Sequence, residues 1–275
     1  MSAITQKTLD ELLNFDDARL EQMKSDMAQA EGFPHFCIDD FLAPDFAAEV
    51  AASYPKYEDA AKVGRSFSAH YEKRKVQVTD STQFPAPVST LNDILASEMF
   101  KYKISYASGI ENLLFDDDLV GGGMHLTQGG GRLDVHVDFN FVKDRGWYRR
   151  FNLLLYLNEE WHPEWGGALE LWDKDVKHRI AEFQPKFNRL CGFVTSEISF
   201  HGVAPVTSPE GKTRKSFAMY YYTKEIGEGI STEHHSTILK HRPNEGWRDT
   251  VVRPISDATR KVKGLSARAL RKLGF

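Results

Sequence analysis

The chain has 275 residues, of which 41% are hydrophobic and 27% are charged, and it carries a net charge of −4 at pH 7. This composition is typical of a globular protein with a sizeable core. It excludes wholesale disorder and offers no general electrostatic attraction for a nucleic acid. Two cysteines, Cys37 and Cys191, are too few for a disulfide framework or for a zinc site with sulfur ligands.

The first hundred residues have mainly helical patterns. We expect one amphipathic helix over residues 5–30, because apolar side chains recur on one face at helical spacing: Leu9, Leu12, Leu13, Leu20, Met23 and Met27. A short strand is predicted at 35–42, helices at 45–54 and 87–100, and a loop or hairpin over 60–85. The N-terminus has no signal-peptide pattern and no apolar run is long enough to cross a bilayer, so we expect a cytoplasmic protein.

From residue 121 onward the pattern changes to short strands. Runs rich in aromatic and β-branched residues alternate with Gly, Pro, Asn and Asp, at 124–128, 134–139, 151–157, 168–172, 189–195, 200–206 and 215–223. Closely spaced strands without intervening helices indicate a sandwich or barrel, and helices that precede the strands argue against a parallel α/β fold. We therefore predict a mainly β protein with flanking helices.

Helical spacing returns over residues 254–275. The last 25 positions of the chain, 251–275, contain seven basic residues. Basic amphipathic helices are usually solvated surface helices. Contact of this helix with a membrane surface or an acidic partner is a weaker alternative.

The segment His136-Val137-Asp138 carries the first chemical signal. Side chains at positions i and i+2 of a strand point to the same side, so the imidazole and the carboxylate can bind one metal ion together. Such a triplet arises often by chance and needs a third ligand from a distant strand. His201 is a candidate, and two histidines with one carboxylate form the facial triad that leaves iron(II) coordination positions open.

A second signal follows in Arg214-Lys215-Ser216. Positions 214 and 216 share a strand face, so a guanidinium and a hydroxyl can point together toward a carboxylate. Taken alone, Arg214 would be an ordinary surface arginine. Together with the triad spacing, it suggests a site for an organic acid beside the metal.

Taken in order, these pieces resemble the Fe(II)- and 2-oxoglutarate-dependent dioxygenases, in their prolyl 4-hydroxylase-like branch. The resemblance covers about residues 32–223 and rests on five segments: His136-Val137-Asp138, Asn152 to Asn158, Trp165 to Trp172, His201 to Pro205, and Arg214 to Ser216. It implies a double-stranded β-helix, the cupin-like jelly roll.

The resemblance also implies roles for particular residues. His136, Asp138 and His201 would bind iron, and the distal carboxylate of 2-oxoglutarate would contact Arg214, with Ser216 and Tyr156 beside it. The interval from His201 to Arg214 is longer than the family commonly shows, which leaves Lys212 as a rival for the carboxylate. Where relatives often have a tyrosine ahead of the H-x-D motif, this chain offers His125 and Thr127.

The implied activity is hydroxylation of an unactivated C–H bond, with 2-oxoglutarate and O₂ converted to succinate and CO₂. Ascorbate is a further stimulant that the resemblance allows. The substrate can be a peptidyl proline, an amino acid or another small molecule. Two alternatives stay open: desaturation or another oxidation of a secondary metabolite or sugar with the same cofactors, and a non-catalytic jelly-roll binding module.

The domain organisation expected from these patterns is an N-terminal helix at 1–31, a dioxygenase domain at 32–225 and a C-terminal extension at 226–275. Apolar side chains that we expect to enclose the site are Phe151, Leu153, Leu155, Leu169 and Phe217. Basic residues over 62–78 and 147–150 are candidates for the substrate opening. His234, His235 and His241 are a possible second metal group, although a solvated loop is the simpler interpretation.

Overall fold

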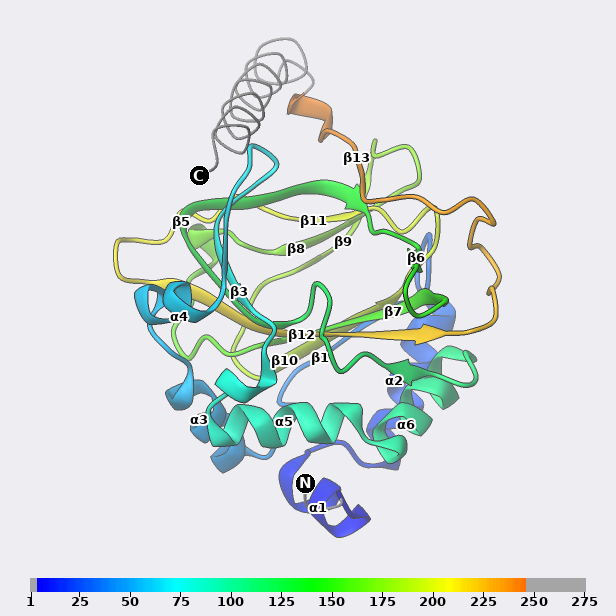
Figure 1. The fold of residues 1–275 in the computed structure, drawn as a ribbon, viewed down its shortest axis with the longest axis horizontal. Helices are drawn as coiled ribbons and strands as arrows, with labels where there is room; N and C mark the ends of the chain where they lie inside the picture. The colour runs from blue at the N-terminus through cyan, green and yellow to red at the C-terminus, as the bar shows by residue number, and fades with distance from the viewer. Residues whose placement is uncertain (1–3, 246–275) are drawn as a thin grey trace, which may run out of the picture.

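The computed structural model describes residues 4–245. Within that range the strands form one thirteen-stranded sheet, and every pairing between them is antiparallel. The sheet folds over on itself into two facing layers (Figure 1). This nearly closed β structure is the predicted jelly roll.

One layer has the order β1 (His35–Ile38), β10 (Arg189–Val194), β7 (Trp147–Tyr156), β12 (Thr213–Thr223) and the first half of β5 (Gly123–Val137). The other layer consists of the second half of β5, then β11 (His201–Val203), β8 (Leu169–Trp172) and β9 (Arg179–Phe183). The hairpin of β2 (Arg65–Ser68) and β3 (Glu72–Val78) adds to β5. Three short strands join the rest: β4 (Leu114–Phe115), β6 (Phe141–Val142) and β13 (Ile238–Leu239).

Strand β5 belongs to both layers. Its residues 123–128 pair with β12, whereas its residues 133–137 pair with β11 and β13. Between the two halves lie three consecutive glycines, and Gly130 has a φ of +84°, which disfavours other residues. Two strands were predicted here, at 124–128 and 134–139. The structure instead has one strand whose glycines allow it to turn from one layer to the other.

Helices cover the outer face of the β1-β10-β7-β12 layer (Figure 1). They are α1 (Gln6–Leu12), α2 (Asp17–Gln29), α3 (Pro44–Ser53), α5 (Ala86–Ala96) and α6 (Glu98–Ser108), while α4 (Tyr57–Val63) lies against β3 and β5. Short 3₁₀ turns occur at Ser81–Gln83, Pro163–Trp165 and Pro243–Glu245. The main core lies between the helices and the sheet, and each large side chain buried there contributes roughly 1.5–3 kcal/mol.

The single helix predicted at 5–30 is wrong. Two helices form, because the backbone of Leu13 bridges to Leu42 and Asn14 donates to the carbonyl of Phe41. Asp16 then starts α2 by accepting a hydrogen bond from the backbone N–H of Arg19. The helix predicted at 87–100 is likewise divided, since the side chain of Ser97 caps a new helix, α6.

The hairpin expected within 60–85 is confirmed as β2–β3, whereas α4 and β9 have no counterpart in the sequence predictions. The helix predicted at 254–275 lies outside the described residues. None of the helices between residues 4 and 245 combines the length and the apolar character that crossing a bilayer requires.

We expect Asn188→Ala to lower the free energy of unfolding by about 2–4 kcal/mol, because the buried Asn188 amide forms two hydrogen bonds with the backbone of Leu42, at 2.8 and 2.9 Å. Asn188 also has a φ of +57°. Asn188→Gly keeps that backbone conformation but removes the amide. Its free energy of unfolding, measured with urea, should therefore fall by a similar amount. A stable glycine variant would show that the backbone conformation, not the amide, is what matters.

Candidate functional site

A cavity of about 820 Å³ lies between the two layers of the sheet. Its lining includes six of the residues predicted for the site: His125, Thr127, His136, Asp138, His201 and Arg214. The hairpin β2–β3 and residues 236–239 form other parts of the wall. Side chains from both layers therefore converge on one enclosed space.

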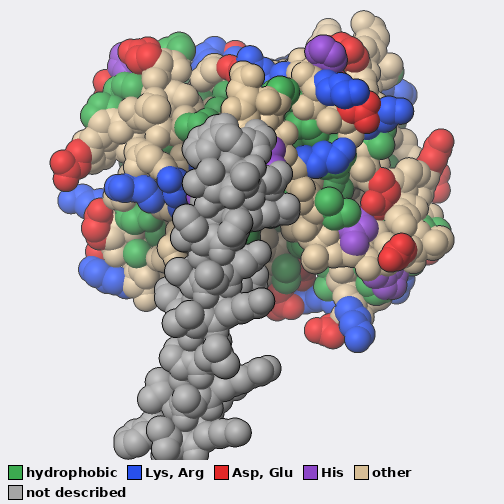
Figure 2. Space-filling view, turned by 90° about the horizontal axis from the view of Figure 1, so that it is seen from above, with side chains coloured by type: hydrophobic (Ala, Val, Ile, Leu, Met, Phe, Trp, Pro, Cys, Tyr) green, Lys and Arg blue, Asp and Glu red, His purple; other side chains and the backbone are tan. Residues whose placement is uncertain are grey.

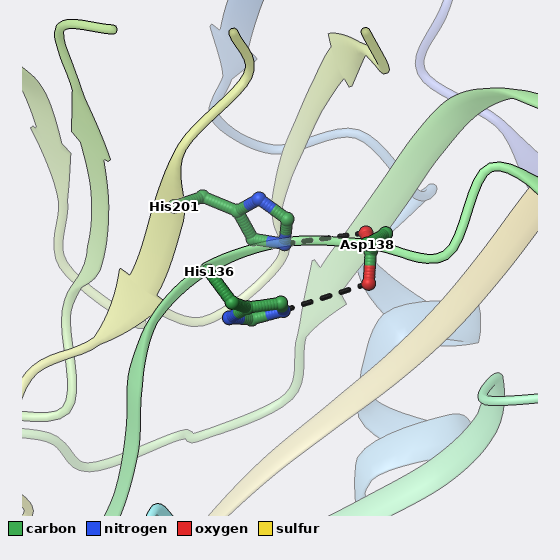
Figure 3. A group of neighbouring side chains, drawn as sticks. All are labelled: His136, Asp138 and His201. Atoms are coloured by element: carbon green, nitrogen blue, oxygen red, sulfur yellow. Dashed lines mark ion pairs between the residues drawn. The ribbon is translucent and has the colours of Figure 1, made fainter. Parts of the chain in front are cut away.

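His136, Asp138 and His201 face one another at one side of this cavity (Figure 3). His136 is near the end of β5, Asp138 follows that strand directly, and His201 begins the neighbouring strand β11, where it is paired with His136. The Nε2 atoms of His136 and His201 lie 3.5 and 3.4 Å from the two Asp138 carboxylate oxygens. One ligand atom from each residue lies within 4.8 Å of the others, and no other such group of three occurs among the described residues.

Hydrogen bonds fix which ring nitrogens are free. Nδ1 of His136 lies 2.9 Å from the carbonyl of Asp134, and Nδ1 of His201 lies 2.9 Å from the carbonyl of Ser199. A carbonyl only accepts, so each Nδ1 carries the proton and donates it. Each Nε2 is therefore the ring nitrogen that faces Asp138 and is left for a metal, as in histidines that bind metals.

The carboxylate of Asp138 is held by two more side chains of β7. The Asn152 amide donates to Oδ2 at 2.8 Å, and the Arg149 guanidinium lies 3.1 Å from the same oxygen. Burial favours the neutral acid, but Arg149 and the two histidines outweigh it and hold the pKa of Asp138 well below its usual range. Burial, assisted by His136, lowers the pKa of His201 to about 3.

The Asp138 carboxylate and the Nε2 atoms of the two imidazoles thus place three potential metal-ligand atoms close together. A cation between them would be attracted by the carboxylate charge and bound by both rings. Two nitrogens and one carboxylate oxygen, with the cavity on the open side, suit iron(II) with free coordination positions. A closed structural zinc site would require a fourth protein ligand.

The residues predicted for the organic acid line up across three neighbouring strands. Ser216 of β12 is paired with Tyr156 of β7 on one side and with His125 of β5 on the other, while Arg214 is paired with Thr127. Because side chains alternate along a strand, all five lie on the inner face of this layer. Arg214, His125 and Thr127 reach the cavity, whereas Tyr156 and Ser216 are completely buried behind Arg214.

Arg214 is a buried cation without an anionic partner in the described part of the chain. Its Nε donates to the carbonyl of Gly167 at 2.6 Å, its Nη1 lies 3.4 Å from the Ser216 hydroxyl, and its Nη2 has no hydrogen-bond partner. The guanidinium lies 4.9 Å from the centre of the Tyr156 ring, and the Tyr156 hydroxyl is also unpaired. A buried guanidinium normally requires a carboxylate or phosphate, so the cavity is suited to an anion at this end.

Gly167 makes the position of Arg214 possible. Its φ is +75°, and a Cβ at this position would lie 3.0 Å from Cδ of Arg214. Glycine is therefore needed both for the backbone conformation and for the space that the arginine occupies. This explains the Trp165-Gly166-Gly167 part of the sequence pattern in structural terms.

The other candidates lie in different surroundings. His125 is buried and its Nε2 lies 3.0 and 3.2 Å from two backbone carbonyls; burial and the charges of Lys75 and Arg214 keep its pKa well below normal. Lys212 is 45% exposed, forms an ion pair with Glu160 and does not line the cavity. The structure therefore favours Arg214 over Lys212.

Arg149 and Asn152 were not predicted as partners of Asp138. Asn152 shares a strand face with Tyr156, so the alternation along β7 could have revealed it. Arg149 could not be found this way, because the pairing of β7 with β12 shifts between Tyr221 and Tyr222, and this bulge turns Arg149 rather than Arg150 into the cavity. The guanidinium then stacks on the Tyr220 ring at 3.5 Å.

The predicted apolar enclosure is largely wrong. Phe151, Leu153, Leu155 and Phe217 belong to the core beneath the helices, and only Leu169 of that set lines the cavity, together with Leu154. The histidines near the C-terminus do not form a metal group either. His235 is paired with Glu197 at 2.8 Å, and His234 stacks on Phe141 with ring centres 3.6 Å apart.

Comparison with known proteins agrees with this geometry. Residues 122–222 match the model of the 2OG-Fe(II) oxygenase superfamily. Prolyl 3-hydroxylase OGFOD1 of Xenopus laevis is 34% identical over 99 residues, which are 34% of this chain and 18% of that protein. The mouse (Mus musculus) protein of the same name is 36% identical over 78 residues, or 27% of this chain and 14% of its own length. The chain thus spans less than a fifth of the curated relatives it matches.

Solved structures show the same fold. A prolyl hydroxylase from Trichoplax adhaerens superposes with a TM-score of 0.55 at 18% identity, covering 76% of this chain and 94% of its own. A prolyl-4-hydroxylase from Pseudomonas putida superposes with a TM-score of 0.52 at 20% identity, covering 74% and 99%. The segment that matches the 2OG-Fe(II) oxygenase model contains His136, Asp138, His201 and Arg214, so the similarity to this superfamily includes the whole candidate site.

Proposed function

We propose that this protein is an Fe(II)- and 2-oxoglutarate-dependent dioxygenase that hydroxylates an unactivated C–H bond. The observation that carries the proposal is the presence, in one cavity, of three converging metal-ligand atoms and a buried arginine without an anionic partner among the described residues. A binding module without catalysis would not need the open side of the triad, where a second ligand can reach the metal.

In this proposal His136, Asp138 and His201 hold the iron, and Arg214 receives the distal carboxylate of 2-oxoglutarate with help from Ser216 and Tyr156. Bound iron and 2-oxoglutarate, with O₂, supply the oxidising power and release succinate and CO₂. The protein's part is to orient these groups. Asn152 and Arg149 hold Oδ2 of Asp138, which would orient this carboxylate toward the metal.

The substrate that we favour is a prolyl residue in a peptide, because the two curated relatives described above carry the name prolyl 3-hydroxylase. The β2–β3 hairpin and residues 236–239 line the cavity, and we expect these segments to contact the substrate. An amino acid or another small molecule is the alternative substrate. Desaturation with the same cofactors is the alternative outcome.

The test begins without oxygen. Fe(II) and 2-oxoglutarate added together should give a weak visible absorption band from the metal–keto acid complex, and His136→Ala should lack it. His162→Ala is the matched control, because His162 is a half-exposed histidine outside the cavity. An intact protein without any band would contradict the proposal.

The same preparation is then exposed to air with candidate substrates. Peptides that contain proline should increase succinate release above the level seen without substrate, and the modified peptide should gain one oxygen atom in mass spectrometry. A peptide with the proline replaced by alanine is the control. Equal succinate release with both peptides would move the substrate assignment to another compound, while the cofactor assignment would stand.

The proposal also includes a domain division, a stimulant, a class of partner and a location. The chain would divide into an N-terminal helical segment at 1–31, the oxygenase domain at 32–225 and an extension at 226–275, and ascorbate would stimulate turnover. On the face seen in Figure 2, Lys and Arg alternate with Asp and Glu over the described surface, which supports a substrate partner rather than a nucleic acid. A cytoplasmic location also stays a prediction.

A further inference from the structure

The only two cysteines of the chain lie side by side in the sheet, on strands that carry none of the metal-ligand candidates. Cys37 of β1 is the direct partner of Cys191 of β10, and their sulfur atoms are 3.4 Å apart. Both are free thiols, Cys37 half-buried and Cys191 completely buried. This pairing could not be predicted from sequence patterns, because 153 residues separate the two positions.

The backbone at this point permits a covalent bond. The backbone N–H of Val194 donates to the carbonyl of Pro34, so these two residues are a hydrogen-bonded pair of the β1–β10 ladder. Hydrogen-bonded and non-hydrogen-bonded pairs alternate along an antiparallel ladder. Cys37 and Cys191 are therefore a non-hydrogen-bonded pair, in which opposite Cα atoms lie about 4.5 Å apart and side chains are closest. This separation is inside the range of roughly 4.4–6.8 Å found for disulfides.

The surroundings give the two thiols different reactivity. The hydrogen bond from the Cys191 thiol lowers the pKa of Cys37, burial opposes this, and the nearby Arg189 guanidinium lowers it further. Burial instead raises the pKa of Cys191 well above its usual value. Cys37 is thus the more easily ionised thiol and the one that solvent reaches, which are the properties of a thiol that reacts first.

We infer that Cys37 and Cys191 are a redox modification site that forms a disulfide when the protein meets a hydroperoxide. The Cys37 thiolate attacks the peroxide O–O bond, which gives a sulfenic acid and one alcohol or water molecule. The Cys191 sulfur then attacks the sulfenic sulfur, and its own proton leaves with the hydroxyl as water. Two thiols are oxidised by two electrons, the peroxide is reduced, and β1 becomes covalently joined to β10.

The experiment treats the full-length protein with hydrogen peroxide while a chelator removes metal ions, so that it does not depend on the proposed oxygenase activity. Thiols are counted after unfolding, before and after treatment. The expected count falls from two to zero, the protein stays monomeric on a non-reducing gel, and dithiothreitol restores two thiols. A peptide that links the two cysteines should appear in mass spectrometry. The thermal midpoint should rise on the order of 5 °C.

Cys37→Ser is the matched control, because position 37 is half-buried and tolerates a polar atom more easily than position 191. In this variant the thiol of Cys191 should remain unmodified at the same peroxide dose, since it is shielded from solvent. The inference would be overturned by a thiol count that stays at two, by a disulfide between two molecules, or by oxidation of Cys37 to sulfinic acid while Cys191 keeps its thiol.

Discussion

Replacing Arg214 with alanine should raise the KM for 2-oxoglutarate about 100-fold, with a much smaller change in the KM for the substrate that is hydroxylated. The guanidinium faces the cavity with Nη2 unpaired, and two charge-assisted hydrogen bonds to a carboxylate are together worth about 3 kcal/mol or more. The measurement is succinate formation at varied 2-oxoglutarate concentration and constant substrate.

Lys212→Ala is the control for this experiment. Lys212 lies on the loop before β12, half-exposed and paired with Glu160, so its removal should leave the KM for 2-oxoglutarate unchanged. If Lys212→Ala raised this KM and Arg214→Ala did not, the carboxylate would bind on the outer side of β12. The assignment of the co-substrate pocket would then be wrong.

The stability of the Arg214→Ala variant provides a second readout. A buried guanidinium without an anion loses its hydration and gains only the hydrogen bonds to Gly167 and Ser216. Its removal should therefore cost little thermal stability in the protein alone. In the presence of 2-oxoglutarate and metal, the wild-type protein should gain stability and the variant should gain much less, since ligand binding stabilises only the state that binds it.

The sequence was sufficient for the metal-ligand candidates because their geometry is local or depends on strand pairing. His136 and Asp138 lie two positions apart, which places both side chains on one side of the chain whatever the rest of the fold is. His201 required the additional expectation of a jelly roll. The structure pairs it directly with His136 on neighbouring strands, an arrangement that strand patterns alone do not determine.

The enclosure of the cavity could not be predicted in the same way, because both faces of β7 are buried. Leu153 and Leu155 pack under the helices, while Leu154 and Asn152 face the cavity, so hydrophobicity does not distinguish the two sides. Tyr156 was predicted to face the site, and strand alternation places Leu154, not Leu153 or Leu155, on the same face as Tyr156. Applying this alternation would have corrected the error. The bulge that turns Arg149 inward, by contrast, depends on a pairing that is visible only in three dimensions.

Helix boundaries were missed for a related reason. Residues 5–30 do show an apolar stripe, and most of its members are buried as expected: Leu9, Leu13, Leu20, Met23 and Met27. The break falls where the chain exchanges its helical hydrogen bonds for contacts with Phe41 and Leu42, residues that are distant in sequence. Tertiary contacts of this kind override local helix preference.

The metal and the charge balance of the site can be separated by two substitutions. His136→Ala and Asp138→Ala should both abolish the rise in thermal midpoint that Mn²⁺, used as a stand-in for iron, gives to the wild-type protein. When the free metal concentration is 100 times its Kd, metal binding adds about 2.7 kcal/mol to the free energy of unfolding. His162→Ala, which alters a half-exposed histidine outside the cavity, should keep the full increase.

Without metal, His136→Ala and Asp138→Ala should differ in their free energies of unfolding. Asp138 is the carboxylate that pairs with Arg149, an arginine that is only 2% exposed, so Asp138→Ala leaves a buried charge unpaired and should cost about 3–5 kcal/mol. His136→Ala leaves the ion pair of Asp138 with Arg149 in place, so its cost should be smaller. Equal loss of stability in both would mean that Arg149 does not depend on Asp138. A persistent Mn²⁺ effect of full size in both would mean that the metal binds elsewhere, because the loss of one of three protein ligands should weaken binding strongly.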